Sequence, residues 1–514
     1  MLLVELLVGL FAAAVALSWA ARSVDVPYPI ALVLGGALLG FVPGLPPLPL
    51  DPNLILGVVL PPVLYQAALL TSWRDFRANI RAISLLAIGL VIATTVAVAA
   101  TLKWLVPETP WAAAFALGAI VSPPDAVAAT AVLSRMNIPR RIVSILEGES
   151  LVNDASGLVL YRFAVAAALT GAFSLAQATW QFVLIAAGGI AVGVALGRLF
   201  VAIHRHLGDT LVEILLSLVL PYAAYLVAES VNLSGVLAVV AAGLVRARYA
   251  REAFSPEARL LAQSVWTVVV FLMNCFVFIL IGAKLPEIVS GLQGQSVAES
   301  IGYGLALSLV AIAVRMAWVV PATYLPRWLL AWLGWPQHSP PLRNVAVVGW
   351  CGMRGIVSLA AALALPLAFP ERDLIVFVSF VVIVVTLVLP GLTLAPLVRA
   401  LRVGGDWSVQ DEQRLARIQT ARAALHELGK LEAEGEITSD VGEFLRREAE
   451  VRLARASPAG LVLADGDDPW CKARLALVRA ERRRLIALWR EGKIGDEVLH
   501  EIERELDIEE SRLV

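Results

Sequence analysis

The sequence predicts an all-α polytopic membrane protein with about thirteen transmembrane helices and a C-terminal helical tail. Its 514 residues are 59% hydrophobic and only 16% charged, and the mean hydropathy is +0.79. Soluble domains are about 45–50% apolar and about 25% charged. Apolar runs of the roughly 20 residues that a membrane helix needs recur along the chain, and basic residues favour alternate loops.

The apolar runs define the candidate spans. The thirteen predicted spans cover residues 2–20, 28–43, 53–70, 80–104, 109–134, 141–170, 176–203, 210–229, 233–248, 262–288, 297–324, 343–367 and 373–401. The third run is broken by Pro61 and Pro62. The first run could also pass for a signal peptide, but it lacks a basic start and carries Glu5, which favours a first membrane helix.

The loop charges predict how the chain is oriented. Cytosolic loops are enriched in Lys and Arg, and here the basic loops follow the odd-numbered spans. Their basic residues are Arg74, Arg77, Arg81, Arg135, Arg140, Arg141, Arg205, Arg246, Arg248, Arg251, Arg327, Arg343 and Arg402. The loops after even-numbered spans hold only Lys103, Lys284 and Arg372. We therefore expect a multi-pass protein of the cell (inner) membrane, with its N-terminus outside and its C-terminus in the cytosol.

The composition inverts near residue 404, which divides the chain into a transmembrane domain (1–403) and a cytosolic tail (404–514) crowded with Glu and Arg. Within the tail, EAEGEITSDVGEFLRREAE (432–450) resembles WREGKIGDEVLHEIERELD (489–507). Each copy reads as helix, Gly turn, Ile, helix, so we expect two related helical hairpins that pack together. A structural cap or a dimer strut is the favoured role of this tail, and regulation is the alternative.

The predicted sixth span contains the polar segment EGESLVND, which begins at Glu147. An ionisable side chain at the centre of a membrane helix costs about 2.5–3.5 kcal/mol, so such residues point to function. At about 1.5 Å per residue, Asp154 lies roughly 20 Å beyond the cytosolic end of the span. Glu147, Ser150 and Asp154 share one face of the helix, and Glu149 with Asn153 forms an adjacent stripe.

Two other spans are interrupted near the middle of the membrane. VSPPDAVAAT contains Pro123 and Pro124, which remove two backbone donors beside Asp125. GWCGMRGIVSLAAA places Arg354 between two glycines. Backbone left unpaired inside a membrane must line a protein-buried or watery cavity. Because broken segments at corresponding positions of two halves mark transporter sites, we expect spans 1–6 and 8–13 to form inverted repeats with crossed broken helices.

Arg354 needs an acidic partner at this depth. Its candidate partners are Glu149, Glu147, Asp154 and Asp125. Arg162 and Arg315 also lie within apolar runs, but closer to a membrane face, so we expect their side chains to snorkel to the surface.

Other classes of site find no support in the sequence. The three cysteines lie far apart and form neither a disulfide framework nor a CxxC metal site, and the five histidines do not cluster. No basic block suggests a nucleic-acid partner. We therefore expect no cofactor and no binding to nucleic acid.

At these polar residues the sequence resembles the cation:proton antiporter-1 family, the monovalent cation/proton antiporters of bacteria and the animal sodium/proton exchangers. The likeness spans about residues 10–400. SPPDAVA (122–128) is similar to the family's Asp-containing segment on a broken helix. GESLVND (148–154) is similar to its Gly-Glu-Ser-x-x-Asn-Asp signature, and GMRGIVSLA (352–360) to its arginine segment.

The resemblance implies which residues form the ion site. Asp154 would bind the transported cation or the proton, and Ser150 would add a hydroxyl oxygen to the cation. Asn153 would hold Asp125 and the broken helix in place. The backbone carbonyl of Pro124 is a further candidate ligand, although Thr or Val is common at that position in the family.

The resemblance also implies a structural ion pair between Glu149 and Arg354. It implies a homodimer, in which each protomer has a dimerisation domain and a six-helix core domain that moves across the membrane. One position departs from the family: in LPPVLYQAALL, Gln66 stands where many members carry an acid, so ion preference and affinity stay open. Glu147 has no implied role; it either lines a cytosolic funnel or meets water there.

The expected function is secondary antiport of a monovalent cation against H⁺. Na⁺ is a hard ion that prefers oxygen ligands, as hard divalent ions do, and competition of Na⁺ and H⁺ for Asp154 would produce exchange. The family resemblance implies that an Asn-Asp pair goes with electroneutral, one-for-one exchange. A K⁺/H⁺ antiporter with the same site is the alternative, and Li⁺ is a further candidate substrate.

Three other functions are disfavoured. A channel needs a continuous pore, which a compact site between two broken helices does not provide. An intramembrane hydrolase would need a membrane-embedded base near Ser150, and the sequence offers none, so we expect no enzyme. A membrane sensor would place its function in the tail, which carries no catalytic or phosphate-binding motif.

Overall fold

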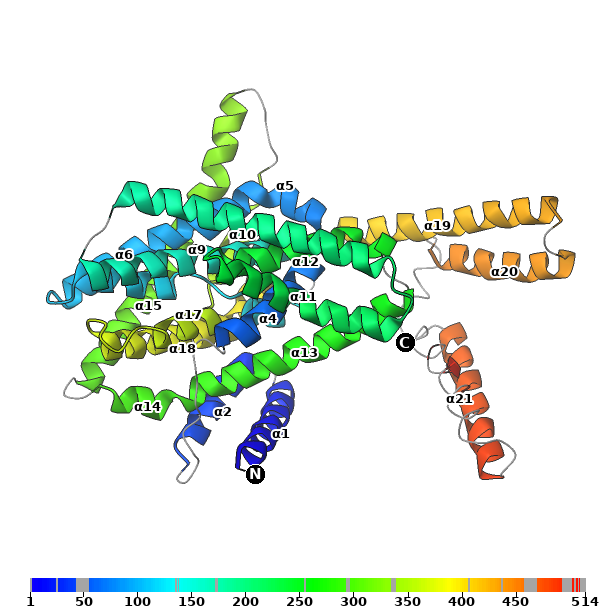
Figure 1. Cartoon of the computed structure of the whole chain (residues 1–514). Coiled ribbons are helices and arrows are strands. Elements are labelled where there is room, and N and C mark those ends of the chain that lie inside the picture. Colours follow the sequence, from blue (N-terminus) through cyan, green and yellow to red (C-terminus); the bar gives the residue numbers. More distant parts are fainter. Residues whose placement is uncertain are drawn as a thin grey trace. The chain divides into compact units, whose positions relative to one another are not determined.

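The computed structural model describes residues 2–24, 26–42, 55–134, 136, 138–171, 174–253, 256–292, 296–333, 339–404, 407–435, 438–456, 469–491, 502, 505, 506 and 508. Every regular element within these residues is a helix (Figure 1). The chain divides into two compact units, Met1–Gly405 and Asp406–Val514. The predicted all-helical architecture is therefore confirmed for the described part of the chain.

The first unit contains the apolar helices. In chain order they are α1 (Leu2–Ser23), α2 (Tyr28–Gly40), the π-helical η1 (Ile55–Val59), α4 (Leu60–Leu70), α5 (Trp73–Ser84), the π-helical η2 (Leu85–Leu90), α6 (Val91–Leu105), α7 (Trp111–Val121), α8 (Ala126–Leu133), α9 (Arg140–Thr170), α10 (Leu175–His204), α11 (Thr210–Ser230), α12 (Gly235–Ala253), α13 (Pro256–Ala283), α14 (Leu285–Ser290), α15 (Val297–Trp332), α16 (Leu342–Trp350), α17 (Ile356–Leu363) and α18 (Arg372–Ala400).

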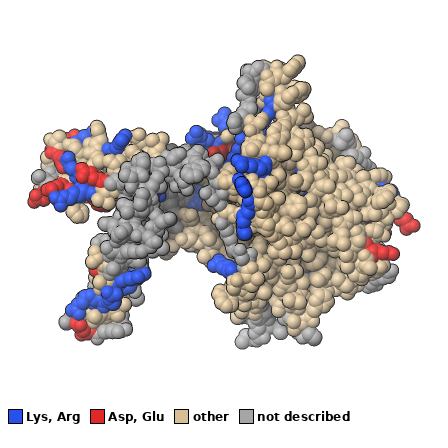
Figure 2. Space-filling view, turned by 180° about the vertical axis from the view of Figure 1, so that it is seen from behind, with Lys and Arg blue, Asp and Glu red and all other residues tan. Residues whose placement is uncertain are grey.

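These helices have the length and composition of membrane spans. Among the described residues, eight continuous helical stretches are long and apolar enough to cross a membrane, and three shorter apolar helices accompany them. Each run predicted from the sequence overlaps one helix or a set of consecutive helices. Figure 2 shows the body of this unit as largely uncharged, with Lys and Arg gathered along one edge.

Side-chain caps explain where several helices begin. Ser72 accepts a hydrogen bond from the backbone N–H of Asp75 at the start of α5, and Asp209 accepts two at the start of α11. Such caps satisfy backbone donors that the first helical turn leaves unpaired. Helix α2 begins with Pro29 in its first turn, where the missing N–H carries no penalty. The break expected at Pro61 and Pro62 is absent, because η1 runs directly into α4 as one continuous helical stretch.

The helices of the first unit form two groups by their contacts. In the first, which we call the α13 group, α1, α2, α4 and α10–α13 pack on one another. In the second, the α9 group, α5–α9 pack with α15–α18. The two groups meet where α4 and α12 contact α9 and where α13 contacts α17. The helix breaks described below lie in the α9 group, on its side facing α4 and α13.

The second unit is polar. It contains α19 (Trp407–Ala433), α20 (Ser439–Ala456) and α21 (Pro469–Arg490). Helices α19 and α20 pack side by side as a hairpin (Figure 1), and Gly435 has a positive φ of 73° in the turn that connects them. The Arg446–Glu432 ion pair joins the two helices. The second copy of the predicted repeat lies mostly outside the described residues.

Candidate functional site

Two breaks in the α9 group meet at the centre of the site. The chain leaves α7 after Val121 and enters α8 at Ala126, and it leaves α16 after Trp350 and enters α17 at Ile356. The backbone N–H of Asp125 donates to the carbonyl oxygen of Met353 at 2.7 Å, so the two breaks touch directly. The sequence-predicted interruptions at Pro123-Pro124 and around Arg354 therefore lie side by side.

Glycine is needed at the second break because the first lies so close. A Cβ atom placed on Gly355 would collide with the carboxylate of Asp125. Any larger residue would force the two broken segments apart. Gly355 thus allows the close approach that brings Asp125 against α17.

Asp125 caps the start of α8 with one carboxylate oxygen, and its other carboxylate oxygen is not used in the cap. Its Oδ1 accepts from the backbone N–H of Val127 at 2.8 Å, which caps the half-helix. Its Oδ2 is buried and has no hydrogen-bond partner within the described part of the chain. A buried acceptor without a partner is costly, so such an atom is a candidate ligand oxygen.

Helix α9 fastens the same break through two of its polar residues. The Asn153 Nδ2 donates to the carbonyl oxygen of Pro124 at 2.8 Å, and the Ser150 Oγ accepts from the backbone N–H of Ala126 at 3.3 Å. Both bonds satisfy backbone groups that the broken helix leaves unpaired. Asn153 is fully buried, and Asp154 is 6% exposed. The contact expected between Asn153 and the broken helix is therefore present.

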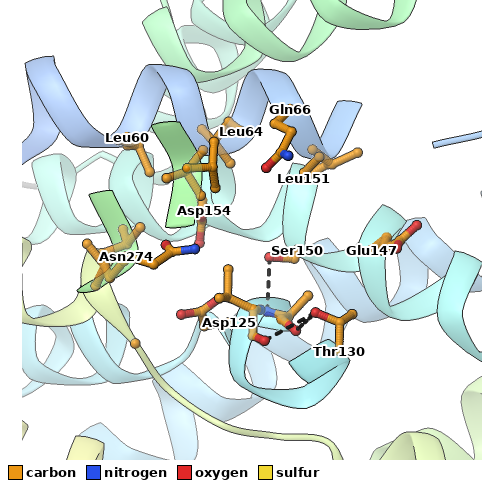
Figure 3. A pocket seen from close by; sticks show the side chains of 18 of the residues that line it. Leu60, Leu64, Gln66, Asp125, Thr130, Glu147, Ser150, Leu151, Asp154 and Asn274 are labelled. Atoms are coloured by element: carbon orange, nitrogen blue, oxygen red, sulfur yellow. Dashed lines mark hydrogen bonds between the residues drawn. The ribbon is translucent and has the colours of Figure 1, made fainter. Parts of the chain in front are cut away.

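A cavity of about 360 Å³ lies between the two helix groups (Figure 3). Asp154, Ser150 and Glu147 of α9 line it, together with Asp125 and Gln66. No Lys, Arg or His appears among the described residues that line this cavity, so its formal charge comes from carboxylates. Figure 3 shows Glu147 at the opposite side of the cavity from Asp154. Of the site residues predicted from the sequence, Asp154, Asp125 and Ser150 are thus brought together in the cavity with Gln66 on the facing wall, whereas Asn153 and Pro124 lie outside its lining.

The structure corrects the predicted ion pair. Glu149 pairs with Arg315 and not with Arg354: Nη1–Oε1 is 2.5 Å and Nη2–Oε2 is 2.9 Å, and both side chains are 1% exposed. Arg315, which the sequence places nearer a membrane face and predicts to snorkel, is instead almost fully buried. Helix α15 in fact continues to Trp332, which puts Arg315 well inside the helix.

Arg354 has a different task. Its Nε donates to the carbonyl oxygen of Val121 at 3.0 Å, and its Nη1 donates to the carbonyl of Gly352. These carbonyls belong to the end of α7 and to the second break, where helical partners are missing. Arg354 therefore satisfies the backbone of the crossed breaks. Arg162, the other arginine expected to snorkel, is partly exposed and pairs with Glu229 at 2.9 Å.

Two residues of this region escaped the reasoning from sequence. Asn274 of α13 is 4% exposed and lines the cavity, and Thr130 of α8 lines it as well. The only sequence signal for Asn274 was a single amide within the apolar run TVVVFLMNCFVFILIG. A single amide in such a run can equally well hydrogen-bond a neighbouring helix.

Known proteins are similar to this chain over most of its length. The family model described as "Sodium/hydrogen exchanger, transmembrane" matches residues 9–400. An uncharacterised Na⁺/H⁺ exchanger of Mycobacterium tuberculosis is 36% identical over 501 residues, 95% of this chain and 92% of that protein. A sodium, potassium, lithium and rubidium/H⁺ antiporter of Bacillus subtilis is 32% identical over 515 residues, 94% of this chain and 74% of that protein.

A solved structure supports the fold. The sodium proton antiporter MjNhaP1 of Methanocaldococcus jannaschii matches with a TM-score of 0.61 at 20% identity. The match covers 78% of this chain and 99% of that chain. The family resemblance drawn from the three motifs is confirmed by the comparisons of sequence.

Proposed function

Because the chain belongs to the sodium/hydrogen exchanger family, we propose that it exchanges a monovalent cation, Na⁺ in the first place, for H⁺ across the cell membrane. The observation that carries this proposal is the cavity around Asp154, which is lined by carboxylates and by no described basic residue. A cation that enters the cavity meets three carboxylates and several hydroxyl and amide oxygens, which are set among apolar side chains. A pocket of this kind attracts and selects small cations.

Asp154 is the group to which the cation or the proton binds. Ser150 adds a hydroxyl oxygen, the backbone carbonyl of Pro124 is a further candidate ligand, and Asp125 has an unpartnered carboxylate oxygen. Asn153 holds the broken helix against α9. Hard cations prefer such oxygen ligands. Since H⁺ and the cation need the same carboxylate, either one displaces the other, and this competition couples their movements.

The cavity indicates the side from which ions arrive. It follows α8 from Asp125 to Ser134 and α9 from Asp154 back to Glu147. The end of the cavity marked by Ser134 and Glu147 lies toward Arg140, the first residue of α9. We assign this basic side to the cytosol. We infer that the structure is open to the cytosol and that movement of the α9 group relative to the α13 group exposes Asp154 to the other side. Glu147 then lines the cytosolic funnel.

The exchange is electroneutral in this proposal, with one cation for one proton. Asn153 is neutral and its Nδ2 donates to the carbonyl oxygen of Pro124, which leaves Asp154 as the carrier. The cargo therefore carries the same charge in both directions. Net charge movement driven by membrane voltage, at equal ion concentrations on both sides, would contradict this stoichiometry.

The finer architecture belongs to the same proposal. We assign thirteen spans in two inverted repeats, with the transmembrane domain over residues 1–403 and the tail of two related hairpins over 404–514. The N-terminus lies outside the inner membrane and the C-terminus lies in the cytosol. The protein is a homodimer that uses no cofactor and does no enzymatic chemistry.

A K⁺/H⁺ antiporter with the same site is the second candidate. Gln66 lines the cavity where many family members carry an acid, so this site has one carboxylate fewer. The Bacillus subtilis relative is itself named for four cations, sodium, potassium, lithium and rubidium. Gln66 is accordingly the residue whose replacement bears most directly on the choice of ion.

Proton flux in proteoliposomes tests the proposal. The vesicles contain a trapped pH-sensitive dye, and Na⁺, Li⁺ or K⁺ is added outside, for the wild type and for Asp154→Asn. We expect Na⁺- or Li⁺-driven flux in the wild type and none in the variant. Flux with K⁺ alone would favour the second candidate. Equal flux in wild type and variant would contradict the assigned role of Asp154.

A further inference from the structure

A buried amide outside the three family-like motifs faces the proposed carrier residue. Asn274 of α13 is 4% exposed, and it lines the same cavity as Asp154. Figure 3 shows the Asn274 side chain and the Asp154 side chain pointing toward one another. The two residues come from different helix groups, so they face each other across the boundary between the α13 group and the α9 group.

A purely structural role does not account well for Asn274. Asn residues in membrane helices commonly hydrogen-bond a neighbouring helix and thereby stabilise packing. The Oδ1 of Asn274, however, is buried and has no hydrogen-bond partner within the described residues. The Asn274 side chain also hydrogen-bonds Tyr28 of α2, which lines the cavity too, so a structural contact accounts for part of the amide and leaves its Oδ1 unexplained. Asn274 therefore belongs to the cavity wall.

We propose that Asn274 is the contribution of the α13 group to the ion site and that its amide sets how well the cation competes with H⁺ for Asp154. This inference rests on the proposed function. An amide carries an N–H that can donate to the ionised carboxylate and an oxygen that can contact the cation. Both interactions favour the cation-bound or ionised site over the protonated one. Asn274 is thus a positioning and specificity residue.

Because Asn274 and Asp154 belong to different helix groups, the distance between them changes when the α9 group moves. Asp154 is carried by α9, whereas Asn274 stays with α13 when the α9 group moves. The amide then reaches Asp154 in the cytosol-open arrangement and loses it in the other. Asn274 accordingly favours the cation on the cytosolic side alone.

Other titratable and charged groups near Asp154 also influence how Na⁺ binding depends on pH. Those that line the cavity are Tyr28 of α2, Asp125 at the first break and Glu147 of α9. The Glu149–Arg315 pair and Arg354 are almost fully buried behind it. Among these groups only Tyr28 interacts with Asn274. The carboxylates therefore keep their own partners in an Asn274 variant, and a pH-dependent shift in the competition between cation and proton reports on the amide.

The test compares Asn274→Leu with a matched control. Thr94→Val removes another buried oxygen that has no partner among the described residues, on α6 and away from the cavity. The apparent KM for cytosolic-side Na⁺ is measured in proteoliposomes at one acidic and one alkaline pH. Loss of a hydrogen bond to a charged group is worth about tenfold or more in affinity. We expect Asn274→Leu to raise KM about tenfold at acidic pH, and less at alkaline pH, with little change in maximal rate.

Thr94→Val should leave both constants near their wild-type values. A KM for Asn274→Leu that is unchanged, or raised by the same factor at both pH values, would overturn the inference. Where Asn274→Leu does not fold, Asn274→Gln keeps the amide but moves it by one methylene, and the same pH-dependent rise is expected on a smaller scale. Absence of exchange in the wild-type protein would instead contradict the proposed function. Failure of the proposed function is therefore distinguishable from failure of the inference about Asn274.

Discussion

Helix α9 carries two buried acids with opposite surroundings. Glu149 is 1% exposed and makes two hydrogen bonds to Arg315, which is equally buried. Asp154 is 6% exposed and lies in a cavity where no described lining residue is basic. A neutralised acid holds helices together, whereas an acid without a fixed cation can accept one from solution. The position of each acid relative to the arginines therefore separates the structural acid from the acid that we propose for transport.

The Glu149–Arg315 pair joins three elements. Arg315 of α15 also donates to the carbonyls of Gly349 and Val348 at the end of α16, at 3.2 and 3.1 Å. The guanidinium thereby links α9, α15 and the helix that precedes the second break. A buried pair of this kind adds little net stability relative to an apolar replacement, but removing one partner leaves an uncompensated charge.

The largest expected effect on stability comes from breaking this pair. Glu149→Gln should lower the free energy of unfolding by about 3–5 kcal/mol, because Arg315 keeps its charge without a counter-charge. The thermal unfolding midpoint of the purified protein measures the loss. Glu147→Gln is the matched control: the same change on the same helix at the cavity wall should leave the midpoint nearly unchanged. Equal midpoints for the two variants would contradict the distinction between the acids.

A change at the crossed breaks should slow transport as well as lower stability. Gly355→Ala places a methyl group against the Asp125 carboxylate, and overpacking of this kind costs about 1–3 kcal/mol. We expect a roughly tenfold lower exchange rate, since 1.4 kcal/mol corresponds to a factor of ten. Gly302→Ala on α15, where an added Cβ meets nothing within 4 Å, serves as the control. Undiminished exchange in Gly355→Ala would show that the breaks tolerate displacement.

A smaller effect is expected when the cavity gains an acid. Gln66→Glu adds a carboxylate to the wall that faces α9. The added negative charge should lower the apparent KM for Na⁺ several-fold, since an opposite charge a few ångströms away contributes about 1 kcal/mol or more. Gln66→Leu, which removes the polar group, should change KM in the opposite direction. Identical KM values for all three proteins would exclude a role for this wall in binding.

The smallest effect is expected from the tail. Deletion of residues 405–514 removes the polar second unit and leaves α18 intact up to Ala400. Exchange in proteoliposomes should persist within about a factor of two, because every proposed site residue lies in the first unit. A factor of two corresponds to a change of less than about 0.5 kcal/mol in the activation free energy of transport. Complete loss of exchange from a folded, truncated protein would assign the tail an essential role.

Much of this organisation could be predicted from the sequence, because the strongest signals are local. Pro123-Pro124 beside Asp125 favours an interruption of the helix, and EGESLVND must place its polar residues on one flank of α9. A Pro-Pro pair is not decisive by itself, since Pro61-Pro62 lie within the continuous helix Leu56–Leu70. The two breaks and the acids of α9 were accordingly located before their contacts were known.

The partner of Glu149 could not be predicted in the same way. The choice between Arg315 and Arg354 depends on how α15 and α16 cross α9, which neither helix encodes by itself. Arg315 was predicted to lie nearer a membrane face, because the sequence does not show that Glu149 of α9 faces it. Asn274 was missed for a related reason: its significance comes from facing Asp154 across two helix groups, and a single amide in an apolar run does not reveal what it faces.

The measurement that tests the central claim most directly is proton release on cation binding. Na⁺ is added to the purified protein in weakly buffered solution, and the pH of the medium is followed for the wild type, Asp154→Asn and Glu147→Gln. If Na⁺ and H⁺ compete for Asp154, the wild type and Glu147→Gln release protons and Asp154→Asn releases none. Equal release from Asp154→Asn, or no release from a wild type that transports Na⁺, would contradict the account.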